Sequence, residues 1–229
     1  MLNTLLWYLA CFGDYMLNLQ GAERLDLVAS LGTLYCVHLT VRRNIWCWPV
    51  GMIASVFAWE LFNTAKLYAD RDLQVYFIAM SLYGWYNWRN GGAEPDTLPV
   101  SRTPARWWPL IIGGVALVTL LIAIPRLLHT DARIPIVDTL PNVLSLVAQV
   151  LLTRKYLEAW ILWIIVDIML VGVYASQGLW YMMGTYTILL AMATQGLLAW
   201  RAELARQEGV DAPTGKDASP VAADAPDSA

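Results

Sequence analysis

Charged side chains are scarce in this sequence, and much of the chemistry that depends on polar residues is missing with them. Only 14% of the 229 residues are Asp, Glu, Lys or Arg, and there are just two histidines. The three cysteines, Cys11, Cys36 and Cys47, form no CxxC or metal-type spacing. No HExxH, GxSxG or GxxxxGK[ST] motif occurs, which disfavours an intramembrane enzyme. We therefore expect no metal, no cofactor and no ATP hydrolysis.

Apolar residues dominate what is present. They make up 58% of the chain, with twelve tryptophans and a mean hydropathy of +0.49, far above a soluble domain of this size. The net charge of −3 gives no reason to expect a nucleic-acid partner, and much of the acid follows Arg201. The start of the chain lacks a basic region and a clear cleavage site, so no signal peptide is expected. The composition predicts a polytopic protein whose environment is the lipid bilayer.

The apolar runs predict seven membrane helices. Residues 1–22 are apolar for too short a stretch to form a clear span, so an interfacial helix is favoured there, and a span stays open. A Gly/Pro-rich loop separates the third run from the fourth, and the Ala/Pro/Asp/Ser-rich tail 202–229 should be disordered. The runs cover about 25–41, 44–64, 72–88, 107–125, 136–152, 157–175 and 179–200.

Basic residues predict the orientation, because cytoplasmic loops hold an excess of Lys and Arg. With seven spans, the side that holds the C-terminus also holds most of the arginines. The C-terminus should therefore be cytoplasmic and the start of the first span external. The residues on that side are Arg42, Arg43, Arg89, Arg102, Arg106, Arg154, Lys155, Arg201, Arg206 and Lys216.

An internal repeat appears when the chain is compared with itself in the register that places Arg42 on Arg154, which we call the repeat register. Charges, tryptophans and glycines near helix ends coincide, which chance does not explain. Repeat 1 (23–89) and repeat 2 (135–201) flank a loop and linker span (90–134), so the expected fold is all-α. Its seven-helix core is arranged 3+1+3 as two parallel repeats, as in SWEET-type transporters. The matches include Arg43 with Lys155, Trp48 with Trp160, Gly84 with Gly196 and Trp88 with Trp200.

The sixth apolar run holds the strongest candidate site. Trp160, Trp163 and Asp167 stand at i, i+3 and i+7, so two indoles and a carboxylate share one helix face. A charge that deep in lipid is costly and should face a protein-lined or watery cavity. Two aromatic plates beside an anion suit a flat, positively charged ligand. The alternative is an ordinary packing face with interfacial tryptophans.

Other polar positions inside the spans extend the candidate site. Asn142 and Gln149 belong to a polar stripe on the fifth span, which also holds Asp138 and Ser145 and must face protein or water. Interhelical hydrogen bonding that only holds the bundle together is the alternative for this stripe. Because Ser55 occupies the position equivalent to Asp167, the site should be asymmetric. The remaining candidates are Gln74 in the third span, Asn87 near its end and Trp48, the repeat mate of Trp160.

Four motifs in the same order give the sequence a family resemblance. W-P-V-G (48–51), K-L-Y-A-D…L-Q (66–74), Y-G-W-Y-N-W (83–88) and T-R-K-Y-L-E-A-W-I-L-W (153–163) resemble the PnuC family of bacterial vitamin transporters. The resemblance covers roughly residues 25–201. It implies an inner-membrane homotrimer and facilitated diffusion of nicotinamide riboside. It further implies trapping by a cytoplasmic kinase, and site residues at Gln74, Gln149, Trp160 and Trp163.

The vitamin itself is left open by two departures from the family pattern. Family members commonly have Asn beside the first tryptophan, where this chain has Ala159 and Ile161, and often Asn where it has Asp167. Nicotinamide riboside and thiamine are both flat cations and fit the predicted site, and riboflavin is carried by some members. A structural or sensory subunit is disfavoured by the repeat and the polar stripes. Ion coupling through Asp167 stays possible.

Overall fold

The described part of the chain is helical. The computed structural model describes residues 21–66, 68–92, 98–129 and 135–210. Within these ranges it contains seven α-helices, a 3-10 turn at Ala105–Trp107 and no strand beyond one isolated bridge, which confirms the all-α class. The helices are α2 (Gly21–Val41), α3 (Cys47–Thr64), α4 (Tyr68–Asn90), α5 (Trp108–His129), α6 (Pro135–Thr153), α7 (Glu158–Ser176) and α8 (Trp180–Val210).

The helix bounds follow the expected spans closely except at the end of α8. The sequence predicted disorder from residue 202, but α8 continues to Val210, so that prediction is wrong for residues 202–210. The extension is held in place because Leu204 is buried and Glu203 lies 3.2 Å from the guanidinium of Arg43. The expected interfacial helix lies outside the described residues apart from 21 and 22, which open α2. The rest of the expected tail, 211–229, also lies outside them.

Length and composition single out three membrane-crossing segments among the described helices. They are Ala105–Pro125, Glu158–Ser176 and Trp180–Gly209. Among the other helices, α6 is apolar over Thr139–Thr153 but shorter, and α4 begins with the charged run Asp70, Arg71 and Asp72. Even α3, with 18 residues, is about 27 Å long at 1.5 Å per residue, close to the thickness of a hydrocarbon core. Polar helices of this length can span a membrane when their polar faces contact protein.

Helix ends in the two halves are built alike. Arg43 and Lys155 have φ values of 56° and 57°, the left-handed conformation that ends a helix. In each case the next backbone N–H donates to a carbonyl five residues back, Asn44 to Leu39 at 2.9 Å and Tyr156 to Leu151 at 3.0 Å. A cation at this position also complements the negative end of the helix dipole. Arg43 and Lys155 are themselves equivalent in the repeat register.

The remaining helix bounds recur in the same register. Moved onto the second half in this way, α2, α3 and α4 would cover 133–153, 159–176 and 180–202, which nearly match α6, α7 and α8. Two other turns correspond as well, since Lys66 and Gly178 have φ values of 58° and 73°. Every described connection of the first half thus has a counterpart in the second.

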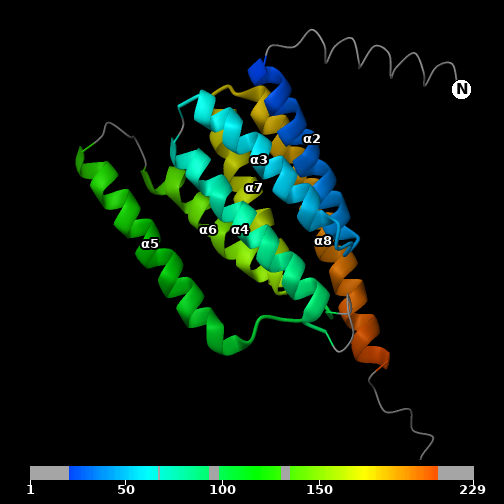
Figure 1. The fold of residues 1–229 in the computed structure, drawn as a ribbon. Helices are drawn as coiled ribbons and strands as arrows, with labels where there is room; N and C mark the ends of the chain where they lie inside the picture. Colours follow the sequence, from blue (N-terminus) through cyan, green and yellow to red (C-terminus); the bar gives the residue numbers. More distant parts are fainter. Residues whose placement is uncertain (1–20, 67, 93–97, 130–134, 211–229) are drawn as a thin grey trace, which may run out of the picture.

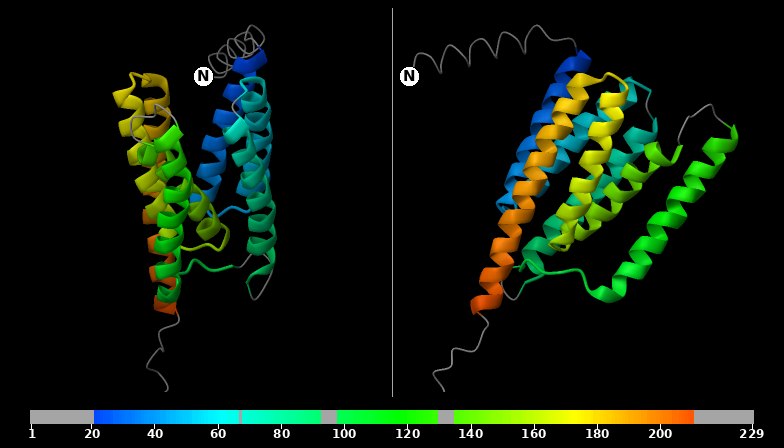
Figure 2. Two further views of the ribbon diagram at one scale, coloured as in Figure 1. Left: turned by 90° about the vertical axis from the view of Figure 1, so that its left-hand side faces the viewer. Right: turned by 180° about the vertical axis from the view of Figure 1, so that it is seen from behind.

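The helices form two layers. In Figure 2, α2, α3 and α4 make one layer, while α7 and α8 lie in the other together with α5. Contacts between the halves run from α2 to α8 and from α4 to α6, again a pair related by the repeat register. Figure 1 shows α5 standing at the margin of the bundle, where it packs mainly against α6. We call the end where α2, α4, α6 and α8 finish the basic end, after Arg42, Arg43, Arg89, Arg154, Lys155 and Arg201.

Candidate functional site

Four tryptophans, Trp48, Trp88, Trp160 and Trp200, form a tryptophan cluster between the halves near the basic end. All four are at most 3% exposed. Trp48 meets Trp88 edge to face at 5.2 Å and 89°, and Trp160 meets Trp200 in the same way at 5.5 Å and 87°. Trp88 and Trp200 lie 5.9 Å apart and join the two pairs. Edge-to-face packing of this kind adds to the stability that burial alone provides.

Glycines make room for two of these rings. A Cβ atom at Gly196 would lie 2.6 Å from three ring atoms of Trp160, and one at Gly84 would collide with Trp48 in the same way. The contacts join α3 to α4 and α7 to α8 at equivalent positions. Glycine is needed here because the indole lies directly on the helix backbone.

The other two rings link the halves by hydrogen bonds. The indole N–H of Trp88 donates to the carbonyl of Leu152, and that of Trp200 donates to the carbonyl of Thr40, both at 3.2 Å. These carbonyls lie in the last turns of α6 and α2, where each also accepts a backbone N–H, from Lys155 at 3.0 Å and from Arg43 at 2.9 Å. The indole N–H groups of Trp48 and Trp160, in contrast, have no hydrogen-bond partner within the described residues.

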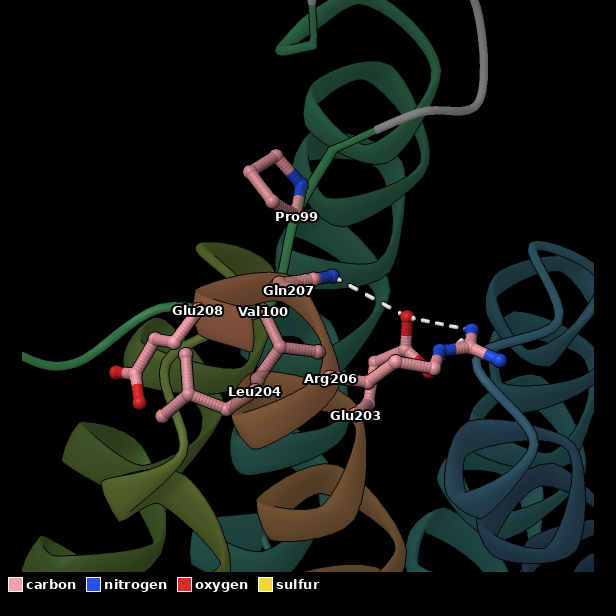
Figure 3. A pocket seen from close by; sticks show the side chains of 7 residues that line it. All are labelled: Pro99, Val100, Glu203, Leu204, Arg206, Gln207 and Glu208. Atoms are coloured by element: carbon pink, nitrogen blue, oxygen red, sulfur yellow. Dashed lines mark hydrogen bonds and ion pairs between the residues drawn. The ribbon is translucent and has the colours of Figure 1, made fainter. Parts of the chain in front are cut away.

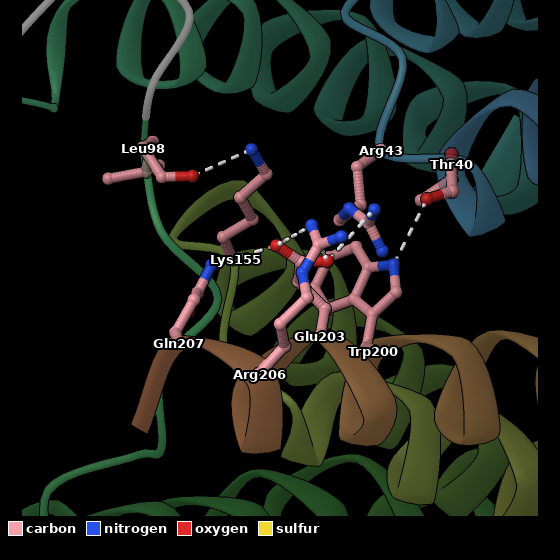
Figure 4. Close-up of polar contacts among 8 residues, drawn as sticks. All are labelled: Thr40, Arg43, Leu98, Lys155, Trp200, Glu203, Arg206 and Gln207. Carbon is pink, nitrogen blue, oxygen red and sulfur yellow. Dashed lines mark hydrogen bonds and ion pairs between the residues drawn. The ribbon is translucent and has the colours of Figure 1, made fainter. Parts of the chain in front are cut away.

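A second set of contacts closes the basic end outside the cluster. Lys155 donates to the carbonyl of Leu98 at 2.7 Å and lies 4.5 Å from the ring centre of Trp88. The segment that follows Leu98 pairs with the start of α7, where the backbone N–H and hydroxyl of Thr103 both donate to Glu158 at 2.8 Å. The contacts of Lys155 and Glu158 therefore hold the loop before α5 across the basic end. Figure 4 shows Arg43 and Arg206 both contacting Glu203 beside this segment.

Asp167 lies in the apolar middle of α7, away from these contacts. It is 3% exposed, and no side chain within the described residues donates a hydrogen bond to it. Tyr186 of α8 lies within electrostatic range of Asp167. A buried carboxylate without a partner is unfavourable by itself, and a positive charge on a bound ligand would compensate it.

The two tryptophans predicted to flank a ligand have different surroundings. Trp160 is 2% exposed and packs against Gly196 and Trp200, so its ring is part of the buried core in this conformation. Trp163 is only half-buried and packs beside the core. The structure brings Trp163 and Asp167 onto one face of α7, and it places Trp48 with the enclosed rings.

The predicted amides also separate into groups. Gln74 and Gln149 are half-buried and make no hydrogen bond within the described residues, whereas Asn142 is exposed. Asn87 donates its amide N–H to the carbonyl of Thr153 at 2.8 Å, which adds another link between the halves at the basic end. The side chain of Asp138 lies outside what the structure describes. Sequence reasoning did not find Tyr76, whose hydroxyl donates to the carbonyl of Leu146 at 2.7 Å across the halves.

The halves differ in the region around Trp163. At the equivalent position the first half has Gly51, where a Cβ would lie 2.9 Å from the sulfur of Cys36 and 3.8 Å from the hydroxyl of Ser81. The second half replaces these neighbours with Ala148 and Ala193, and it replaces the glycine with Trp163. The small side chains of Ala148 in α6 and Ala193 in α8 make room for the indole of Trp163 in α7. The asymmetry expected from Ser55 and Asp167 therefore extends to the helices around them.

Two surface cavities are separate from these residues. One of about 470 Å³ lies at the end of α8 and is shown in Figure 3. The other, about 290 Å³, is an apolar groove between α5, α6 and α7. Neither is lined by a predicted site residue, so neither is assigned to the site. The first is lined by Pro99, Val100, Glu203, Leu204, Arg206, Gln207 and Glu208.

The chain is similar in sequence to known vitamin transporters. Residues 23–202 match the family described as nicotinamide mononucleotide transporter. The nicotinamide riboside transporter PnuC of Escherichia coli K12 is 29% identical over 204 residues, covering 77% of this chain and 84% of that protein. The riboflavin/roseoflavin transporter RibM of Streptomyces davaonensis is 28% identical over 182 residues, covering 76% and 83%.

The fold agrees with this placement. The crystal structure of the vitamin B3 transporter PnuC superposes with a TM-score of 0.64, covering 88% of this chain and 90% of that one at 24% identity. With the family match spanning most of the sequence, the resemblance seen in four motifs is confirmed. The chain belongs to the PnuC, or nicotinamide mononucleotide transporter, family and is a multi-pass membrane transporter of that family.

Proposed function

We propose that this protein carries nicotinamide riboside across the bacterial inner membrane by facilitated diffusion. The observation that carries the proposal is Asp167, a carboxylate buried in an apolar helix without a hydrogen-bond donor among the described residues. A pyridinium ring would supply the missing positive charge, and half-buried Trp163 would supply an aromatic face. The names of relatives such as the Escherichia coli transporter support this substrate.

The remaining predicted residues take roles that follow from their burial. Gln74 and Gln149 are half-buried, with amides available to hydroxyl groups of a ribose. Trp48 and Trp160 lie on the basic-end side of the site as part of the tryptophan cluster. Asn87 links the two halves at the same end through its hydrogen bond to Thr153. Asn142 is exposed and stays a candidate for contact with substrate on its way in.

The fold proposed for this function is the 3+1+3 arrangement, with α2–α4 and α6–α8 as parallel repeats and α5 as the linker. The recurrence of helix bounds and of left-handed turns in the repeat register supports it. The marginal position of α5 supports it as well. Substrate sites of such transporters lie near mid-membrane between the repeats, which is where Asp167 stands within α7.

We place the basic end in the cytoplasm, because lysine and arginine concentrate there. In this conformation the tryptophan cluster and its two hydrogen bonds between the halves close that end. Release into the cell would then require Trp88 to leave Leu152 and Trp200 to leave Thr40. The path from Asp167 toward the other end has no comparable cluster of buried rings within the described residues.

Trapping and assembly complete the proposal. The sequence lacks a nucleotide-binding motif, so accumulation would depend on a cytoplasmic kinase that phosphorylates the imported vitamin. A homotrimer is proposed from the family resemblance. Riboflavin is the second candidate substrate, favoured by the Streptomyces relative, and thiamine is a third because it too is a flat cation.

The test is flux of labelled nicotinamide riboside, thiamine and riboflavin into proteoliposomes that hold the purified protein. Asp167→Asn should reduce affinity for the cations about tenfold or more and leave riboflavin unchanged, because it removes a charge and keeps the shape. Glu60→Gln is the control, since Glu60 is exposed on α3. Cation transport equal to wild type in Asp167→Asn would refute the site. Uptake above the external level that collapses with a proton gradient would refute facilitated diffusion.

A further inference from the structure

A stacked pair of tyrosines lies between Asp167 and the end of the bundle opposite the basic end. Tyr174 is close to the last turn of α7, and Tyr186 is in the second turn of α8. Their ring centres are 5.3 Å apart, and the rings are inclined by 30°. Both are half-buried, so an aromatic surface is partly open at this end. The site described above gives neither ring a contact with the substrate.

A carboxylate of the first half lies at the same end of the bundle as this pair. Asp70, in the first turn of α4, is half-buried and lies within electrostatic range of both Tyr174 and Tyr186. Asp167, nearer the middle of α7, also lies within electrostatic range of Tyr186. Two carboxylates, one from each half, therefore lie within electrostatic range of Tyr186.

The cation nearest in sequence does not neutralise Asp70. Arg71 directs its guanidinium to Asp72, with the closest nitrogen 2.7 Å from the carboxylate, and its remaining nitrogen reaches Asn63 at 3.4 Å. Asp72 is exposed, so that pair lies at the surface. Asp70 makes no ion pair within the described residues. Its negative charge remains available to a ligand that enters from this end.

We propose that Asp70, Tyr174 and Tyr186 form a second binding site for flat organic cations, through which substrate passes before it reaches Asp167. The inference rests on the proposed function, since it takes Asp167 as the inner site. A ring cation would stack on the tyrosines and be attracted by Asp70, while a neutral ring of the same shape would gain the stacking alone. The outer site selects charge before the substrate leaves water.

The experiment compares adjacent carboxylates. Asp70→Asn removes the free charge, and Asp72→Asn removes the charge already paired with Arg71. We measure uptake kinetics in proteoliposomes and titrate the detergent-purified protein with 1-methylnicotinamide, a pyridinium cation, and with neutral nicotinamide. Asp70→Asn should raise KM for nicotinamide riboside and weaken the binding of 1-methylnicotinamide, each about three- to thirtyfold. It should not change Vmax or the binding of nicotinamide. The difference from wild type should shrink as salt rises, because the site is partly open to solvent.

Two further variants separate this site from Asp167. Tyr174→Leu removes one ring and no charge, so it should weaken the binding of both probes. This variant tests the proposal even if Asp70→Asn does not fold. In Asp167→Asn, the remaining binding of 1-methylnicotinamide should be lost when Asp70→Asn is added. Equal behaviour of Asp70→Asn and Asp72→Asn, or unchanged binding in Tyr174→Leu, would overturn the outer site. Wild-type uptake in Asp167→Asn with impaired Asp70→Asn would instead refute the inner site and leave this one standing.

Discussion

The contact between Gly196 and Trp160 predicts how much disturbance the tryptophan cluster tolerates. In Gly196→Ala the new Cβ would lie 2.6 Å from ring atoms Cε2, Cη2 and Cζ2 of Trp160. Carbon atoms at rest are about 3.5–4.0 Å apart, so the indole or the helix must move by about 1 Å. Trp160 is 2% exposed and meets Trp200 at 5.5 Å, which leaves no free volume to move into.

The expected energy follows from two opposing effects. Overpacking of a closed core costs about 1–3 kcal/mol. Alanine regains about 1 kcal/mol over glycine inside a helix, which offsets part of that cost. Gly184 lies in the same helix, and a Cβ added there would meet nothing within 4 Å, so Gly184→Ala gains helix propensity without a clash. The two variants should therefore differ by about 1–3 kcal/mol, with Gly196→Ala the less stable.

Thermal unfolding in detergent measures this difference. For a chain of this size 1 kcal/mol corresponds to about 2–4 °C, so the two alanine variants should unfold several degrees apart. Gly84→Ala should behave like Gly196→Ala, because it meets Trp48 at the equivalent position. Equal melting of Gly196→Ala and Gly184→Ala would show that the indole is not confined, and the tryptophan cluster could then not close the basic end.

Two further predictions concern the contacts that surround the cluster. Trp200→Phe removes the donor to the carbonyl of Thr40, whereas Trp48→Phe removes an indole N–H that has no partner within the described residues. The first variant should therefore lose about 0.5–1.5 kcal/mol more stability than the second. Thermal unfolding of the two variants in parallel tests this. Glu203→Gln breaks the pair with Arg43 and should cost at most about 1 kcal/mol, with the loss of melting temperature disappearing in high salt. A loss that persists in high salt would contradict a surface ion pair.

Much of the fold could be predicted from the sequence because the helix signals are local. Apolar runs and short polar breaks located all seven described helices. The repeat register paired Gly84 with Gly196 and Trp48 with Trp160, yet it gave no reason for these identities. The reason is a contact between different helices, in which an indole covers a backbone without Cβ. Sequence periodicity describes one helix at a time and does not predict which helices meet.

The helix extension past Arg201 was missed for a different reason. Its Ala, Glu, Arg and Gln residues are good helix formers, although they resemble the tail in polarity. A polar composition alone does not distinguish an exposed helix from a disordered tail, and the sequence does not show the tertiary contacts of Glu203 and Leu204. The role of Lys155 was hidden likewise. Its partner Leu98 lies in a loop 57 residues away, for which no pattern predicts a position.

The similarity of the two halves explains why the site around Asp167 occurs once although its supporting contacts occur twice. Equivalent tryptophans, glycines and turns support both halves, so changes to them would disturb both sides of the tryptophan cluster. Specialisation is confined to positions that the framework does not use. There the first half packs Gly51 against Cys36, and the second has Trp163 and, one turn further, Asp167. In the middle of the bundle one buried carboxylate then suffices, because a second buried charge there would find no second cation to compensate it.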